Sequence, residues 1–133
     1  MKLVTFTFNG TTSIGAINGD HIVDFSSSSL PNNMIDFIAL GDQGLDTAKN
    51  LIDNSENKIE LGQVHLEAPI TKPSKILAVG LNYKEHQDEV AQTAAKTIGK
   101  AQEKYPNIFN KQNSSVNGPY DDVHRPRASE FLD

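Results

Sequence analysis

The 133-residue sequence predicts an α+β fold, in which a small antiparallel β-meander is accompanied by helices and followed by a second unit. Three short runs of alternating apolar and polar residues stand near the start, and two Asn-Gly pairs separate them. Two amphipathic stretches with helical spacing come next. The charge balance changes at Lys72-Pro73, so we place a small N-terminal domain at residues 1–72 and a second domain at residues 73–133.

The meander is predicted from local pattern alone. Residues 2–8 alternate with a period of two, as a strand with one buried face does. Asn9-Gly10 suits the positive φ angles of a tight hairpin turn, and a second strand follows at residues 12–17. Asn18-Gly19 supplies another turn signal before a third strand at residues 21–25. Three such runs joined by two tight turns favour antiparallel neighbours.

Two helices and one more strand complete the predicted N-terminal domain. Pro31 can begin a helix, and apolar residues at helical spacing continue it until Gly41. A second amphipathic helix is predicted at residues 45–52. Residues 59–66 return to strand-like alternation. His21 and His65, each alone in a predicted strand, are interpreted as ordinary strand residues, because a single imidazole implies no site.

Composition and charge exclude several classes of function. Residues 1–72 carry four Lys against nine acidic residues, whereas residues 73–133 carry eight of each sign. An acidic chain without grouped Lys and Arg is a poor partner for nucleic acid, because phosphate neutralisation requires such groups. The absence of cysteine excludes disulfides and thiolate metal sites. No apolar run is long enough for a signal peptide or a membrane span, so we expect a cytoplasmic protein without a membrane partner.

The most informative segment follows Pro73. Residues 76–79 form a continuous apolar run, which predicts a strand buried on both faces and ended by Gly80. A helix is predicted from about Lys84, and loops between a buried strand and a helix often carry functional side chains. His86 and Glu89 are three residues apart, so on a helix they lie on one face within hydrogen-bonding reach.

The His86–Glu89 spacing suits a general base. A carboxylate that accepts a hydrogen bond from one imidazole nitrogen fixes the tautomer and raises the basicity of the other nitrogen. In an arbitrary sequence, however, a solvated pair on a helix surface is the commoner explanation. Two potential ligands without a third do not make a zinc site either.

The residues around this pair change its interpretation. Residues 72–89 resemble the opening of the fumarylacetoacetate hydrolase catalytic domain, a P-x-K-I strand followed by G-x-N-Y-x-x-H-x-x-E. Residues 106–111 resemble the family's P-x-x-F-x-K element, and residues 114–126 are similar to the stretch that follows it. The start of the chain, up to Phe25, is similar to the small N-terminal domain of the longer family members.

The resemblance implies an enzyme that acts on carbon–carbon bonds next to carbonyls, by hydrolysis, decarboxylation or isomerisation. A divalent cation, Mg²⁺ or else Mn²⁺ or Ca²⁺, would hold a small keto acid or diketone and polarise its oxygens. His86, on a lid helix, would be the base, and Glu89 would orient it. Lys111 would position a substrate oxygen, although a solvated strand lysine is an equally good interpretation.

The chain departs from the family pattern at its end. The family's metal ligands are carboxylates in a D-x-E-x-E-L strand and beyond, and no residue up to Asp133 matches them. Glu130 precedes that position, and Asp121 and Asp122 have the character of turn residues. We therefore expect a truncated chain that holds only the opening strand and lid helix of a mainly-β (β-roll) catalytic domain and cannot bind the metal alone.

Three further expectations accompany this interpretation. The complete enzyme is expected to be a homodimer, and the alanine-rich lid segment, residues 84–104, to be disordered or displaced here. An alternative stays open, in which the chain is a non-catalytic α+β binding module or a pseudoenzyme remnant and His86 and Glu89 are incidental. A coding sequence that continues past Asp133 with a Y-E-x-E-L motif would favour the enzyme.

Overall fold

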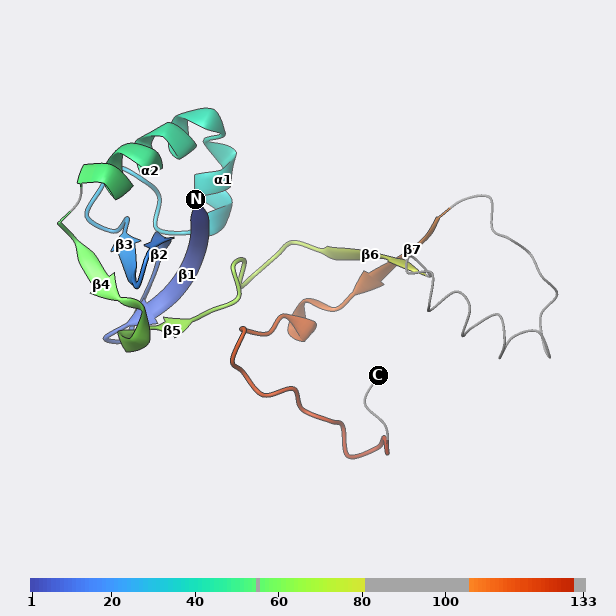
Figure 1. Ribbon diagram of the computed structural model, residues 1–133. Helices are drawn as coiled ribbons and strands as arrows, with labels where there is room; N and C mark the ends of the chain where they lie inside the picture. The colour runs from blue at the N-terminus through green and yellow to red at the C-terminus, as the bar shows by residue number, and fades with distance from the viewer. Residues whose placement is uncertain (55, 81–105, 131–133) are drawn as a thin grey trace. The chain divides into compact units, whose positions relative to one another are not determined.

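The computed structural model describes residues 1–54, 56–80 and 106–130 (Figure 1). The chain divides into two compact units, one of Met1–Thr71 with Val116–Asp133 and one of Lys72–Ser115. The first boundary adjoins the one expected at residue 72, whereas residues 116–130 return to the first unit. The assignment of residues 73–133 to a separate catalytic domain stays a prediction.

The first unit contains a five-stranded antiparallel sheet with the strand order β4-β3-β2-β1-β5. The predicted meander is confirmed, with Lys2 opposite Ile17 at one end of the first hairpin and Phe8 opposite Thr11 at the other. The turn between them has positive φ angles, 49° at Asn9 and 78° at Gly10, which these residue types tolerate. The strands are β1 (Lys2–Phe8), β2 (Thr11–Asn18), β3 (His21–Asp24), β4 (Lys58–Glu60) and β5 (His65–Leu66).

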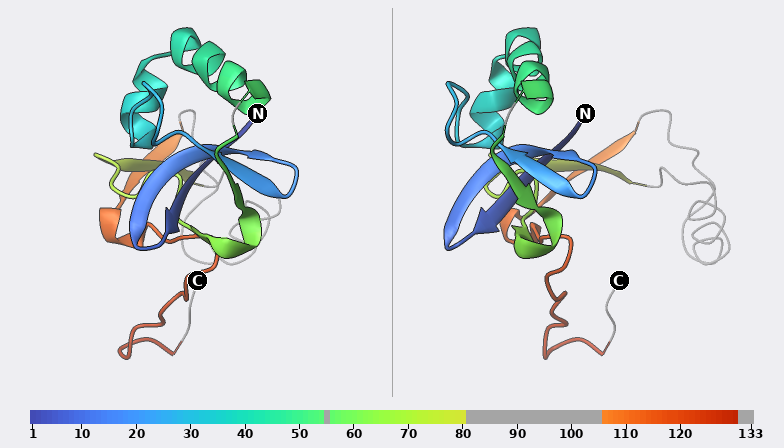
Figure 2. Two further views of the ribbon diagram at one scale, coloured as in Figure 1. Left: turned by 90° about the vertical axis from the view of Figure 1, so that its left-hand side faces the viewer. Right: turned by 60° about the vertical axis from the view of Figure 1, so that its left-hand side comes forward.

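The prediction of one strand over residues 59–66 is wrong. This run is two strands, and a short 3-10 helix, η1 (Leu61–Gln63), separates them. β4 pairs with β3 and β5 pairs with β1, so the chain crosses from one edge of the sheet to the other within a few residues. Such a crossing requires a curled sheet, and Figure 2 shows the curl. Alternation continues through the crossing, and for that reason the pattern did not reveal it.

Both predicted helices are present, as α1 (Met34–Ala39) and α2 (Asp42–Asn54), and they cover one face of the sheet (Figure 2). α1 begins three residues after Pro31 because the Asn33 side chain accepts a hydrogen bond of 3.0 Å from the Asp36 amide. Gly41, with φ of 58°, ends it. The core between helices and sheet consists of Ile14, Ala16, Val23, Phe25, Leu30, Met34, Phe37 and Ala48.

The second unit contains a two-stranded antiparallel ribbon of β6 (Ile76–Gly80) and β7 (Asn107–Lys111). The expectation that residues 76–79 are buried on both faces is wrong. Leu77 is 62% exposed and Ile108, on the same face of the ribbon, is 60% exposed. The apolar run predicted burial, but β6 has one neighbouring strand and no second layer of described residues covers it.

Several sequence-based expectations concern residues that the structure leaves undescribed. The lid helix from Lys84, the state of residues 84–104, and the pair His86–Glu89 all lie outside the described residues. Within the described ranges, no helix combines the length and apolar character needed to cross a bilayer.

Candidate functional site

Lys111 is the predicted site residue that the structure describes. It is the last residue of β7, lies opposite Ile76 of β6, and is exposed. His86 and Glu89 belong to the part of the chain without a described structure, so their proximity to each other and to Lys111 stays a prediction.

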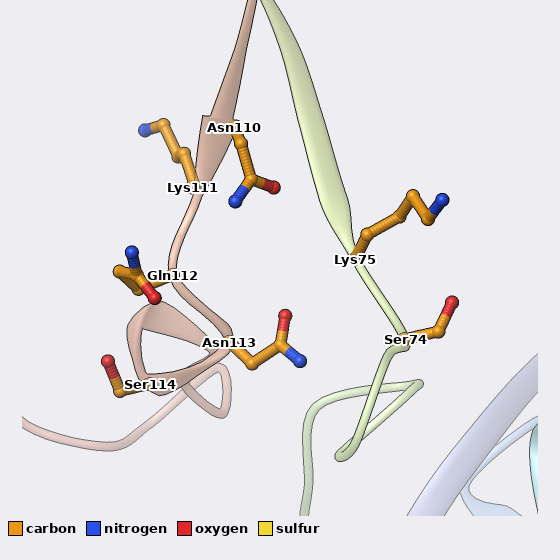
Figure 3. Close-up of a pocket in the computed structure, with 7 residues that line it drawn as sticks. All are labelled: Ser74, Lys75, Asn110, Lys111, Gln112, Asn113 and Ser114. Atoms are coloured by element: carbon orange, nitrogen blue, oxygen red, sulfur yellow. The ribbon is translucent and has the colours of Figure 1, made fainter.

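A polar cavity of about 320 Å³ lies at the Lys111 end of the ribbon (Figure 3). Chain reversal after β7 forms one side of it, in the 3-10 helix η2 (Asn113–Ser115), where the Ser115 hydroxyl donates to the Gln112 carbonyl over 2.7 Å. The side-chain amide of Asn113 donates a hydrogen bond of 2.8 Å to the Pro73 carbonyl and so connects the two sides of the cavity. The lining residues are Ser74, Lys75, Asn110, Lys111, Gln112, Asn113 and Ser114.

The cavity is electropositive. Two lysines and no acidic residue line it, and the described part of this unit adds Lys72 without any Asp or Glu. Figure 3 shows Lys75 and Lys111 extending away from each other, with Asn110 between the two strands. Among the described residues Lys111 has no hydrogen-bond or ion-pair partner. An ammonium group in this setting can donate hydrogen bonds to a carboxylate or enolate oxygen, or to water.

Sequence reasoning missed the cavity because its two sides are far apart in the chain. The P-x-K-I and P-x-x-F-x-K elements were recognised separately, and nothing in either element states that they pair. Their antiparallel register, with Ile76 opposite Lys111, brings residues 74–75 beside residues 112–114. Assuming that the two elements are neighbouring strands would have predicted the cavity.

Asp121, near the end of the described chain, has structural partners. Asp121 lies in a turn, as predicted, where its Oδ2 accepts a hydrogen bond of 2.9 Å from the Gly118 amide. Its Oδ1 lies 3.2 Å from Nε2 of His65. His65 is a strand residue of β5, as predicted, but the sequence did not indicate this contact, because Asp121 is remote from it in the chain.

No metal site is formed by the residues that the structure describes. Over residues 1–54, 56–80 and 106–130, no three His, Asp or Glu side chains gather closely enough to hold an ion. A hard divalent cation requires several oxygen ligands around it. The described residues therefore do not fit such a group.

Comparisons with known proteins give the family. Residues 75–133 match the model of the fumarylacetoacetate (FAA) hydrolase C-terminal domain. The whole chain aligns at 33% identity with 41% of the mitochondrial oxaloacetate tautomerase fahd2 of Xenopus laevis. It aligns at 34% identity with 43% of a fumarylacetoacetate hydrolase domain-containing protein 2 homolog of Dictyostelium discoideum.

Solved structures agree with the sequence comparisons. A maleylpyruvate hydrolase from Sphingobium sp. SYK-6, in complex with manganese(II) and pyruvate, matches 96% of this chain and 43% of its own, with a TM-score of 0.63 and 27% identity. A fumarylacetoacetate hydrolase from Exiguobacterium antarcticum matches 94% of this chain and 40% of its own, with a TM-score of 0.61 and 27% identity. Both are named as hydrolases, one of fumarylacetoacetate and the other of maleylpyruvate.

The α+β fold, the matched domain and these relatives all indicate one family of enzymes. The chain belongs to the fumarylacetoacetate hydrolase family. It spans about two-fifths of the length of the curated relatives it matches, 41% and 43% for the two named above.

The expectation of a cytoplasmic protein is contradicted by the relatives. Those from Xenopus laevis, Rattus norvegicus and Homo sapiens carry names that place them in mitochondria. The expectation rested on the lack of a long apolar run. That criterion does not separate the two compartments, because mitochondrial transit peptides are amphipathic and Arg-rich rather than continuously apolar.

Proposed function

We propose that this chain supplies the N-terminal part of an enzyme that interconverts the keto and enol forms of oxaloacetate. The alignment of the whole chain with the Xenopus laevis oxaloacetate tautomerase carries this proposal. The pyruvate bound to the maleylpyruvate hydrolase supports a 2-keto acid as the substrate class. Of the three outcomes that the resemblance allows, isomerisation agrees with the name of the Xenopus laevis relative and hydrolysis with the names of the two solved structures, whereas decarboxylation has no such support.

His86 and Glu89 are proposed to carry out the proton transfer. Tautomerisation removes a proton from the carbon next to the ketone and places one on the oxygen, so it needs a group that accepts and returns protons near neutral pH. An imidazole does this, and a carboxylate three residues later on a helix can hold its tautomer. Glu89 is therefore a positioning residue in this proposal, and His86 is the base.

Lys111 is proposed to hold an oxygen of the substrate. Its support is the electropositive cavity without an acidic lining residue, which suits the carboxylate or the developing enolate of a keto acid. A divalent cation such as Mg²⁺ or Mn²⁺ would polarise the substrate oxygens in the complete enzyme, and its ligands are proposed to lie outside the described residues. Homodimer formation by that complete enzyme is likewise a proposal.

The test compares two proteins. One is the 133-residue chain, and the other is the same chain joined after Asp133 to the remaining sequence of the Xenopus laevis relative. With oxaloacetate and Mn²⁺, the decay of the enol absorbance should be accelerated by the joined protein and not by the shorter chain. His86→Ala should lower kcat by about 10²- to 10⁴-fold, the usual contribution of general acid–base catalysis.

Two outcomes would contradict the proposal. Turnover by the 133-residue chain, lost on His86→Ala, would contradict its catalytic incompleteness. If the joined protein folds and keeps its full activity after His86→Ala, His86 is not the catalytic base. His124→Ala is the matched control, since His124 is an exposed histidine to which no role is assigned.

A further inference from the structure

A turn in the first unit is built so that one carboxylate makes two different contacts. Residues 117–121, Asn-Gly-Pro-Tyr-Asp, reverse the chain through a hydrogen bond of 3.4 Å from the Asp121 amide to the Gly118 carbonyl. Asp121 Oδ2 accepts a hydrogen bond from the backbone amide of Gly118. The side-chain amide of Asn117 donates a hydrogen bond of 3.0 Å to the backbone carbonyl of Asp121. Pro119 follows Gly118, the first of the four residues closed by this hydrogen bond, and its fixed φ suits that position.

The turn lies against β5, one of the two edge strands of the five-stranded sheet. A Cβ at Gly118 would lie 3.4 Å from the Leu66 carbonyl and 2.6 Å from Asp121 Oδ2, so the backbone approaches both closely. Asn117 and Pro119 also form part of the wall of a mainly apolar cavity of about 280 Å³, with Leu66 among its other lining residues. The turn is therefore seated on the strand and does not extend into solvent.

The contact between Asp121 Oδ1 and His65 Nε2 joins the turn to the strand. At 3.2 Å it is within hydrogen-bonding distance, and the two side chains are 51% and 40% exposed. The same carboxylate thus holds the turn through Oδ2 and the strand through Oδ1. His65 lies before the matched hydrolase domain, residues 75–133, and Asp121 lies within it.

We propose that His65 is a positioning residue, which fixes the course of residues 117–130 by holding Asp121. The N-terminal domain would in this way orient a segment of the hydrolase domain that leads toward the family's carboxylate strand. The effect on activity depends on the function proposed above. The contact itself does not, so the two ideas can fail separately.

The test uses two substitutions of similar size. In His65→Gln, the side-chain amide nitrogen can take the position of His65 Nε2 and keep the contact with Asp121. In His65→Asn, the shorter side chain places its amide nitrogen near the position of Nδ1, too far from Asp121 to make the contact. By NMR on the 133-residue chain, amide exchange of Gly118 and Asp121 should become about five- to tenfold faster in His65→Asn and change less than about twofold in His65→Gln. His21→Asn, in β3, should leave both exchange rates unchanged.

Two results would overturn the contact. One is an equal exchange rate of the Gly118 and Asp121 amides in all three variants, and the other is an equal acceleration of this exchange in His65→Gln and His65→Asn. Unchanged exchange of the β1–β2 amides verifies that the fold is intact. In the joined protein, His65→Asn should lower kcat for oxaloacetate with an unchanged KM, and His65→Gln should restore it. If the joined protein is active and its kcat does not change in His65→Asn, the positioning role is overturned. If the joined protein is inactive, this counts against the proposed function, but the amide-exchange test of the His65–Asp121 contact remains valid.

Discussion

Gly15, in the middle of β2, lies where the meander has no room for a side chain. A Cβ there would collide with the backbone carbonyl of Val23 and would lie 2.8 Å from the Ile22 side chain. Because the first obstacle is backbone, Gly15→Ala can be accommodated only by moving β3. We expect the free energy of unfolding to fall by about 1–3 kcal/mol, as for other overpacked positions, in urea denaturation followed by circular dichroism.

Gly62→Ala is the control for this prediction. No heavy atom lies within 4 Å of a Cβ at Gly62. The stability of this variant should stay within about 0.5 kcal/mol of wild type. A similar loss in both variants would indicate a general effect of replacing glycine and not the close approach of β2 to β3.

Lys111 can be tested against Lys75, which lines the same cavity and extends to its other side (Figure 3). In the joined protein, Lys111→Met should raise KM for oxaloacetate about ten- to hundredfold, the range for losing a hydrogen bond to a charged group. Lys75→Met should change KM less than about threefold. Steady-state kinetics that give equal effects would assign Lys111 a general electrostatic role, and an unchanged KM would favour the solvated lysine.

Among the elements, helix α1 has a buried residue and an exposed residue at adjacent positions, Phe37 and Ile38. Phe37 is 1% exposed and its ring centroid lies 5.8 Å from that of Phe25, whereas Ile38 is 55% exposed. Phe37→Ala should lower the free energy of unfolding by about 3–5 kcal/mol, and Ile38→Ala should change it by less than about 0.5 kcal/mol. Thermal or urea denaturation of the two variants measures the difference, and equal losses would show that α1 does not anchor the core as described.

Sequence pattern predicted the elements that depend on neighbouring residues. Strands β1 to β3 and both helices follow from alternation, Asn-Gly turns and helical spacing, because each is formed by contacts within a few residues. The division of residues 59–66 between two sheet edges and the contact of His65 with Asp121 depend on residues remote in sequence. No local period encodes such pairings, so a single sequence did not predict them.

For the molecule as a whole, the two units differ in how much apolar surface they bury. The first unit has fully buried Phe25 and Ile22, whereas in the ribbon Leu77 and Ile108 are largely exposed. A two-stranded sheet without a covering layer is marginally stable in water. Amides of β6 and β7 should therefore exchange with solvent deuterium much faster than those of β1 and β2, as measured by hydrogen exchange with mass spectrometry.

Comparable protection in the two units would contradict this prediction. It would mean that the apolar side chains of the ribbon are covered in solution. The sequence predicted β6 but also predicted that it would be buried. An apolar run shows that a strand has side chains suited to burial, but it does not show that neighbouring elements cover them. The family came from motifs, and these do not depend on such packing.

The arrangement of β5 and the turn at residues 117–121 also sets an order of events in folding. The strands β1, β2 and β3 form neighbouring hairpins with two-residue turns, so they close only short loops and can pair early. β5 must then find β1 across about sixty residues, and the turn reaches β5 only after a further fifty. During synthesis from the N-terminus, β5 is therefore made before the turn that lies against it, and until the turn follows, the β5 edge is open to pairing with other chains.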